Sequence, residues 1–262
     1  MPASIVWYTS FIVVGLLAII SFSTTLFFLR RILKMRQWQD IYLTLVYILI
    51  ALSTIPLFTN LLVIPVLGIN PESQNLLLTM WRFGLSSNLV YLLPLAAFAK
   101  MTFRSDSRIT SFYVQLVMFS AGFLIAFMFF FLSYTFTWDE GTWLLLYNYD
   151  NISTVYLFAL PVMFVLPWFF YETFKLYLRE RRKDTPNPIQ LRRFSLLTLS
   201  SVSLIINFFG SSVALSLYTP EAINTPLGLL LYVQPYAFIG AFVILSSIGW
   251  IMPKFATKRI EE

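Results

Sequence analysis

The sequence predicts an all-α polytopic membrane protein in which seven transmembrane helices form one bundle. The 262 residues are 58% hydrophobic and only 11% charged, whereas a soluble domain is about half apolar and about a quarter charged. Apolar runs of about 20 residues, the length that crosses the hydrocarbon core as a helix, follow one another along the chain. Because backbone groups in lipid must be hydrogen-bonded internally, helices are the structure expected for these runs.

The predicted helices occupy the chain from end to end, so residues 1–262 are expected to form a single transmembrane domain. The second and fourth helices are long enough to tilt or to continue into the interface. The predicted ranges are about 4–29, 41–68, 77–99, 109–135, 153–178, 194–217 and 227–250. Prolines within several helices are expected to kink them, because proline removes a backbone hydrogen bond. These are Pro56, Pro65, Pro94, Pro161, Pro167 and Pro235.

The basic residues predict the orientation. Every lysine and arginine except Arg82 lies in the first, third or fifth connection, close to its ends, or after the seventh helix. Cytoplasmic loops carry such an excess of basic residues. The opposite side carries acids and no other base: Glu72, Asp139, Glu140, Asp150 and Glu221. We therefore expect the N-terminus outside and the C-terminus in the cytoplasm, with the protein integral to the cell membrane.

The residues that the chain lacks exclude much chemistry. It contains no cysteine and no histidine, which excludes disulfides, thiolate metal sites, His-ligated haem and Ser-His-Asp triads. No glycine-rich phosphate loop is present. We therefore expect no cofactor, no metal site and no enzymatic activity. A nucleic-acid partner is not expected either, because the positive charge faces a membrane surface, where anionic lipid attracts it.

Arg82 is the one base outside this segregation. It lies in the third predicted helix, about five residues or roughly 7–8 Å from its outer end. One interpretation is structural: the side chain reaches up to the headgroups or pairs with an outer acid. The other is functional: Arg82 lines an outward cavity and meets an anionic ligand, since a charge within the membrane is a candidate functional group.

Polar amides inside the helices are few, and they accompany Arg82 as candidates. Gly84, Asn88 and Tyr91 share one face of the third helix, which suits close packing and hydrogen bonding between helices. The alternative is a polar pocket formed by the third, sixth and seventh helices. The ligand-binding candidates are Arg82, Asn88, Asn207 and Gln234.

The fifth connection, "RERRKDTPNPIQLRR", is the longest on the inner side. Pro186 and Pro188 are expected to end any helix that extends into it. Its charge can simply reflect insertion topology and attraction to anionic lipid. A basic, stiffened loop also suits contact with a cytoplasmic protein. The partner-contact candidates are Arg181, Arg182, Arg192 and Arg193.

The longest outer loop, residues 136–152, is rich in tryptophan and tyrosine. One interpretation is an aromatic belt at the membrane–water interface. The other is a lid over an outward pocket, in which "WLLLY" lies down as a short amphipathic segment.

The seven-helix pattern, the third-helix stretch "MWRFGLSSNLVYLLPLAAFAKMTF" and the connection "YLRERRKDTPNPIQLRRFSLLTL" together resemble the seven-transmembrane sensor region of membrane histidine kinases. The resemblance implies a sensor. Because no kinase domain follows Trp250, its output is expected from another chain. The topology is also similar to that of microbial opsins. The seventh helix, "LYVQPYAFIGAFVILSSIGW", lacks the lysine that retinal requires there.

Three functions remain open. The first is a receptor-like sensor that binds a small or lipophilic ligand and signals to a separate cytoplasmic protein. The second is an accessory or scaffold subunit of a larger membrane complex, because apolar faces suit protein as well as lipid. The third is a small-molecule transporter, against which the sequence shows no inverted repeat and no pair of broken helices in corresponding halves.

Overall fold

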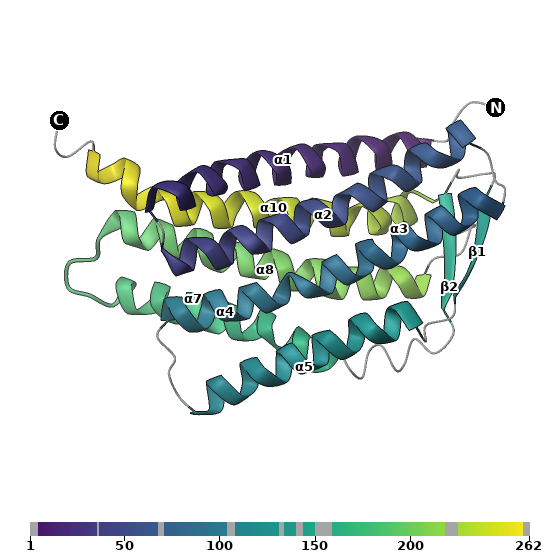
Figure 1. Cartoon of the computed structure of the whole chain (residues 1–262). Coiled ribbons are helices and arrows are strands. Elements are labelled where there is room, and N and C mark those ends of the chain that lie inside the picture. The colour runs from purple at the N-terminus through teal and green to yellow at the C-terminus, as the bar shows by residue number, and fades with distance from the viewer. Residues whose placement is uncertain are drawn as a thin grey trace.

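Long helices run side by side in alternating directions through the computed structural model (Figure 1). It describes residues 5–35, 37–67, 71–103, 108–130, 134–139, 144–149, 159–217 and 225–258. The elements in chain order are α1 (Ile5–Met35), α2 (Trp38–Leu67), α3 (Pro71–Val90), α4 (Leu92–Phe103), α5 (Arg108–Phe130), β1 (Tyr134–Asp139), β2 (Leu144–Tyr149), α7 (Val165–Arg181), α8 (Pro188–Leu217) and α10 (Pro226–Lys258). Residues 159–163 are also helical.

Five of the described helices are long and apolar enough to cross a membrane. The qualifying stretches are Trp7–Lys34, Trp38–Pro56, Arg108–Phe127, Pro188–Gly210 and Pro226–Ile251. Their outer faces carry large apolar side chains; on α5, for example, Phe112 and Phe119 are 67% and 71% exposed. Such surface is unfavourable in water and favourable in hydrocarbon. These helices indicate an integral membrane protein.

Two further segments have helical stretches that are interrupted by a single residue, and both interruptions lie three residues before a proline. Tyr91 separates α3 from α4 before Pro94, and Phe164 separates residues 159–163 from α7 before Pro167. Proline has no N–H to donate to the carbonyl four residues earlier. The i→i−4 bonds continue on both sides, as from Leu95 N–H to the Tyr91 carbonyl (3.2 Å). The helices are therefore not unwound there, and the proline that follows each interruption is expected to kink them.

These two interruptions show which of the predicted kinks divide a helix. Pro56, Pro65 and Pro235 lie within the continuous helices α2 and α10. Pro94 and Pro167 accompany the interruptions. A proline therefore marks a candidate kink in the sequence, while the surrounding packing decides whether the helix divides there.

A β-hairpin replaces part of the expected outer loop. Strands β1 and β2 pair antiparallel, with Tyr134 opposite Tyr149 and Asp139 opposite Leu144. The prediction of helix up to residue 135 was wrong at its end, because α5 ends at Phe130. Of the "WLLLY" stretch, residues 144–147 belong to strand β2, and its role as a lid or as part of an aromatic belt stays a prediction. Strand β1 is rich in threonine and aromatic residues, and β2 contains two tyrosines; these residue types favour extended structure. Trp143 lies outside the described residues.

Several helices begin or end beyond their predicted limits. Helix α3 begins at Pro71 and α8 at Pro188, each six residues early, because proline suits the first helical position. Arg82 is therefore about 16 Å along its helix from the first residue, rather than 7–8 Å. Helix α10 continues to Lys258. Residues 153–158, the predicted start of the fifth helix, lie outside the described residues.

The two ends of the bundle differ in composition. The end at the left of Figure 1 holds the α1–α2 turn, the loop between α7 and α8 and the last turns of α10. We call it the basic end, because Lys34, Arg108 and Arg181 lie there, in the last turn of α1, at the start of α5 and in the last turn of α7. The hairpin lies at the opposite end, which we call the hairpin end (Figure 1). Between the ends, a core of fully buried side chains that includes Phe28, Phe98 and Phe242 joins the helices.

Candidate functional site

A fully buried carboxylate joins three helices at the basic end. Asp40, in the first turn of α2, has no exposed surface. Its Oδ2 accepts a hydrogen bond from Arg31 Nε of α1 at 2.9 Å. Its Oδ1 accepts another from the indole Nε1 of Trp250 on α10 at 2.7 Å. Both carboxylate oxygens are therefore bonded, which is the condition under which a buried charge is tolerated.

The short turn between α1 and α2 creates the ion pair. Arg31 and Asp40 are nine residues apart, and the two helices run in opposite directions, so the end of one meets the start of the other. A cation is favoured at a helix C-terminus and an anion at a helix N-terminus, because of the aligned peptide dipoles. The local sequence thus supplies this half of the network, whereas Trp250 arrives from 210 residues away.

A second polar layer lies deeper in the bundle on the same helices. Tyr47, two turns after Asp40 on α2, is fully buried, and its hydroxyl is 2.7 Å from Ser246 Oγ on α10. Ser246 is one turn before Trp250, so both residues face α2. Ser246 also donates to the Phe242 carbonyl (2.6 Å). Two hydrogen-bonded layers therefore tie α2 to α10.

Arg193, on α8, contacts the Trp250 indole of the Asp40 network. Its guanidinium carbon lies 5.0 Å from the centre of the Trp250 ring, a cation–π distance. Its Nε is buried without a hydrogen-bond partner. A close approach of α8 and α10 creates this contact. A Cβ added to Gly249 would lie 3.3 Å from the Arg193 carbonyl oxygen and 3.2 Å from Leu196 Cβ. Only glycine allows the two backbones to approach so closely without a shift.

Aromatic packing connects the same indole to α4 and α7. Phe98 of α4 is buried, with its ring 5.0 Å from Trp250 and 6.2 Å from Phe169 of α7. The Trp250 pair is edge-to-face, an arrangement that aromatic rings favour. Trp250 therefore contacts Asp40, Arg193 and Phe98 together. A displacement of α4 would therefore be transmitted through Phe98 and Trp250 to the Asp40 carboxylate.

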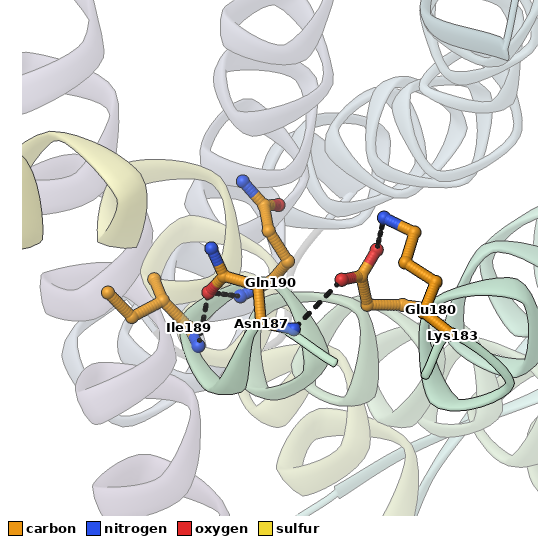
Figure 2. A network of polar contacts seen from close by, with 5 residues as sticks. All are labelled: Glu180, Lys183, Asn187, Ile189 and Gln190. Carbon is orange, nitrogen blue, oxygen red and sulfur yellow. Dashed lines mark hydrogen bonds and ion pairs between the residues drawn. The ribbon is translucent and has the colours of Figure 1, made fainter. Parts of the chain in front are cut away.

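The loop between α7 and α8 is held by a second carboxylate (Figure 2). Glu180 accepts hydrogen bonds from Lys183 Nζ (2.6 Å) and from the backbone N–H of Asn187 (3.1 Å). These bonds, the Lys183 bond first, hold the pKa of Glu180 below its ordinary value. The Asn187 side-chain oxygen accepts the N–H groups of Ile189 and Gln190, as an N-cap does. The expected break at Pro186 and Pro188 is confirmed, and the loop is ordered.

The four ligand-binding candidates lie in two places. Arg82 and Asn88 are on α3, which packs mainly against α2; Gly84 meets Pro56 there. Arg82 is half-buried and has an interaction partner within the chain.

Asn207 and Gln234 belong to the extensive contact between α8 and α10, where the Gln234 side chain packs against Gly210. Asn207 is half-buried and has a partner as well. Among the described residues, no extensive contact joins α3 to α8 or α10. That the four residues line one cavity stays a prediction.

The four partner-contact candidates also differ from one another. Arg181, Arg182 and Arg192 are exposed, whereas Arg193 is half-buried and packs on Trp250. The first three are free to meet another molecule, and Arg193 is partly committed to the bundle.

Sequence reasoning missed Asp40. Asp40 directly precedes a helix predicted to start at about residue 41, so it was not among the candidate residues. One signal pointed to it: Asp40 follows Trp38 closely and precedes a long apolar run, so it falls in the first helical turn rather than in a loop. Nothing in the sequence connects it to Trp250, because that contact depends on how the helices pack.

The site holds charges rather than reactive groups. Among the described residues, no cluster of three or more acidic side chains could hold a metal ion. What the arrangement can do is couple helices to one another and offer positive charge at its rim. No protein-family model matches the sequence, and a search among curated proteins finds no match.

Proposed function

We propose that this protein is a receptor-like membrane sensor that signals through its basic end to a separate cytoplasmic protein. In this proposal the chain crosses the membrane seven times, with the N-terminus outside. Two features support the topology. The start of α1 and the end of α10 lie at opposite ends of the bundle (Figure 1), which requires an odd number of crossings. The five long helices and the two kinked segments together make seven.

The observation that carries the proposal is the contact of Phe98 with Trp250 and Phe169. Phe98 lies just after the Pro94 kink, on α4, and Arg82 lies before that kink, on α3. A ligand that shifts α3 would move α4 about the kink. Because Phe98 is packed against Trp250 at 5.0 Å, that motion reaches the Asp40 network. Two packings of kinked helices are the kind of bistable element that a receptor needs.

The output surface in this proposal is the loop between α7 and α8. Phe169, which contacts Phe98, is on the helix that leads into this loop. The loop is ordered by Glu180 and Asn187, so a tilt of α7 would move it as a unit. Its exposed arginines Arg181, Arg182 and Arg192 suit an acidic surface on a soluble protein.

Purification from native membranes in mild detergent, followed by mass spectrometry, tests this proposal. The test variant changes Arg181, Arg182 and Arg192 to glutamine. Its matched control changes three other exposed bases of the same end, Arg30, Lys34 and Arg108. We expect a soluble signalling protein in substoichiometric amounts, lost with the loop variant and retained with the control. Equal loss in both variants would show a general charge effect and contradict the proposed contact.

The variant Arg82→Leu tests the input half of the proposal. It should change the recovery of that soluble protein while leaving the abundance of the sensor in the membrane unaltered, because the ligand contact is lost and the fold is kept. Abundance is measured by immunoblot of isolated membranes. If recovery and abundance fall together, Arg82 is a structural residue.

An accessory subunit of a larger membrane complex is the second candidate. The exposed aromatic face of α5, with Phe112 and Phe119, favours it, because such a face can pack on protein as well as on lipid. The same purification separates the two functions. Stoichiometric recovery of other membrane subunits would establish the accessory role and refute a free-standing sensor.

A further inference from the structure

Two arginines contact the Asp40 network in different ways. Arg31 bonds the carboxylate itself, whereas Arg193 packs on the Trp250 indole that bonds the same carboxylate. In the part of the chain that the structure describes, Arg193 has neither a hydrogen-bond nor an ion-pair partner. A partly buried cation without a counter-ion is unfavourable, more so beside a second cation. Among the described residues, the Arg193 guanidinium therefore lacks a negatively charged partner.

The neighbouring aromatic rings preorganise the side chain of Arg193 for binding an anion. The guanidinium carbon lies over the Trp250 ring, 5.0 Å from its centre, and 5.8 Å from the centre of the Phe194 ring. Arg193 is only half-buried, so part of the group can still be reached from outside. Stacking on an indole fixes the plane of the guanidinium, which lowers the entropy lost when its N–H groups bond a ligand.

The position along the helix indicates where the anion comes from. Arg193 lies five residues after Pro188, the start of α8, or roughly 8 Å along the axis. Tryptophan is typical of the membrane–water interface, and Trp250 lies beside it. With the basic end at a membrane surface, this position would lie near the lipid phosphates. A guanidinium binds phosphate with two parallel hydrogen bonds, which an ammonium cannot do.

We propose that Arg193, stacked on Trp250, binds the phosphate group of an anionic phospholipid at the basic end of the bundle. Arg31 adds to the local potential but is committed to Asp40. The bound phosphate would neutralise the charge of Arg193 and bridge the lipid to the contact between α8 and α10. This inference does not rest on the proposed sensor function.

Native mass spectrometry of the purified full-length protein tests the site. The protein in mild detergent is titrated with dioleoyl phosphatidylglycerol and, separately, with dioleoyl phosphatidylcholine. The variants are Arg193→Gln and its matched control Arg192→Gln, the exposed neighbour with the same charge change. We expect Arg193→Gln to weaken the tightest phosphatidylglycerol adduct about tenfold, as for the loss of charge-assisted hydrogen bonds. Arg192→Gln should change it less than about twofold.

Each other outcome has a definite meaning. Unchanged binding by Arg193→Gln, or an equal loss in Arg192→Gln, would overturn the proposal, as would equal affinity for phosphatidylcholine. Displacement of the adduct by millimolar inorganic phosphate would overturn the lipid source and leave a site for free phosphate. If Arg193→Gln loses its helical circular dichroism, Arg193→Lys replaces it. That variant keeps the charge but not the planar fork, and severalfold weaker binding is expected.

The purification described above reports on a different property. A soluble partner can be recovered whether or not phosphatidylglycerol binds, because its proposed contacts are Arg181, Arg182 and Arg192. The two experiments can therefore refute the lipid site and the proposed sensor function independently of each other.

Discussion

The basic end contains two acid-centred networks that differ in their reach along the sequence and in the exposure of their basic partners. Asp40 is fully buried, and its partners Arg31 and Trp250 come from two other helices. Glu180 orders a loop, and its partners Lys183 and Asn187 are three and seven residues away. The Lys183 side chain is 54% exposed, against 10% for Arg31. Both acids are buried, but the Asp40 network joins elements that are distant in sequence, whereas the Glu180 network shapes only its own segment.

The largest expected effect comes from removing the buried acid. Asp40→Ala leaves Arg31 and the Trp250 indole without their acceptor, and breaking a buried pair in this way costs about 3–5 kcal/mol. The free energy of unfolding in detergent, measured by denaturant titration, gives the value. The control is Asp184→Ala, an exposed acid of the same end, which should change stability by less than about 0.5 kcal/mol. Similar losses in both variants would show that the buried position of Asp40 gives it no special role in stability.

An intermediate effect is expected from Trp250→Phe. The substitution keeps an aromatic ring beside Arg193 and Phe98 but removes the N–H that Asp40 accepts. A hydrogen bond to a charged group contributes about 1.5–3 kcal/mol. Trp38→Phe serves as the control, because the Trp38 side chain is 63% exposed. If Trp250→Phe is as stable as the parent protein, the long-range half of the Asp40 network contributes nothing and the comparison fails.

The smallest effect is expected at Glu180, and pH reveals it. Its hydrogen bonds to Lys183 and Asn187 hold its pKa in the folded protein below the ordinary value of 4.5. A lowered folded-state pKa stabilises the fold above the unfolded value, and the contribution is lost as pH falls through the folded value. Glu180→Gln should therefore be less stable than the parent at pH 7. This difference should vanish as the pH is lowered through and below 4.

Thermal unfolding of both proteins from pH 7 to pH 3 measures this difference. A stability gap that does not depend on pH would mean that Glu180 acts through packing and not through its charge.

The helices were largely predictable, and the site was not. Apolar runs located the long helices, and Pro188 after Asn187 marked the break before α8. The hairpin was missed because a short apolar run bounded by aromatics has no periodicity that separates strand from helix. The start of α3 and the end of α10 were missed because polar residues in the first or last turn of a helix resemble those of a loop.

The candidate residues show the same division. Arg82 was singled out because it departs from the segregation of basic residues along the chain. The arginines of the α7–α8 loop were singled out because they follow it. Asp40 and Trp250 were not paired, since no local pattern connects residues 210 positions apart. Gly249 was not singled out, although its missing side chain lets α8 lie against α10.

The sequence by itself determined that this chain belongs in lipid, because its apolar surface exceeds what an aqueous fold can bury. The charge asymmetry that favours one orientation is also written in the sequence. Only the tertiary structure decided which acid is buried, which indole bonds it and which arginine is left without a partner. These three contacts depend on how the helices pack. One glycine or one proline changes the distance between two backbones, and that distance cannot be read from the sequence of a single segment.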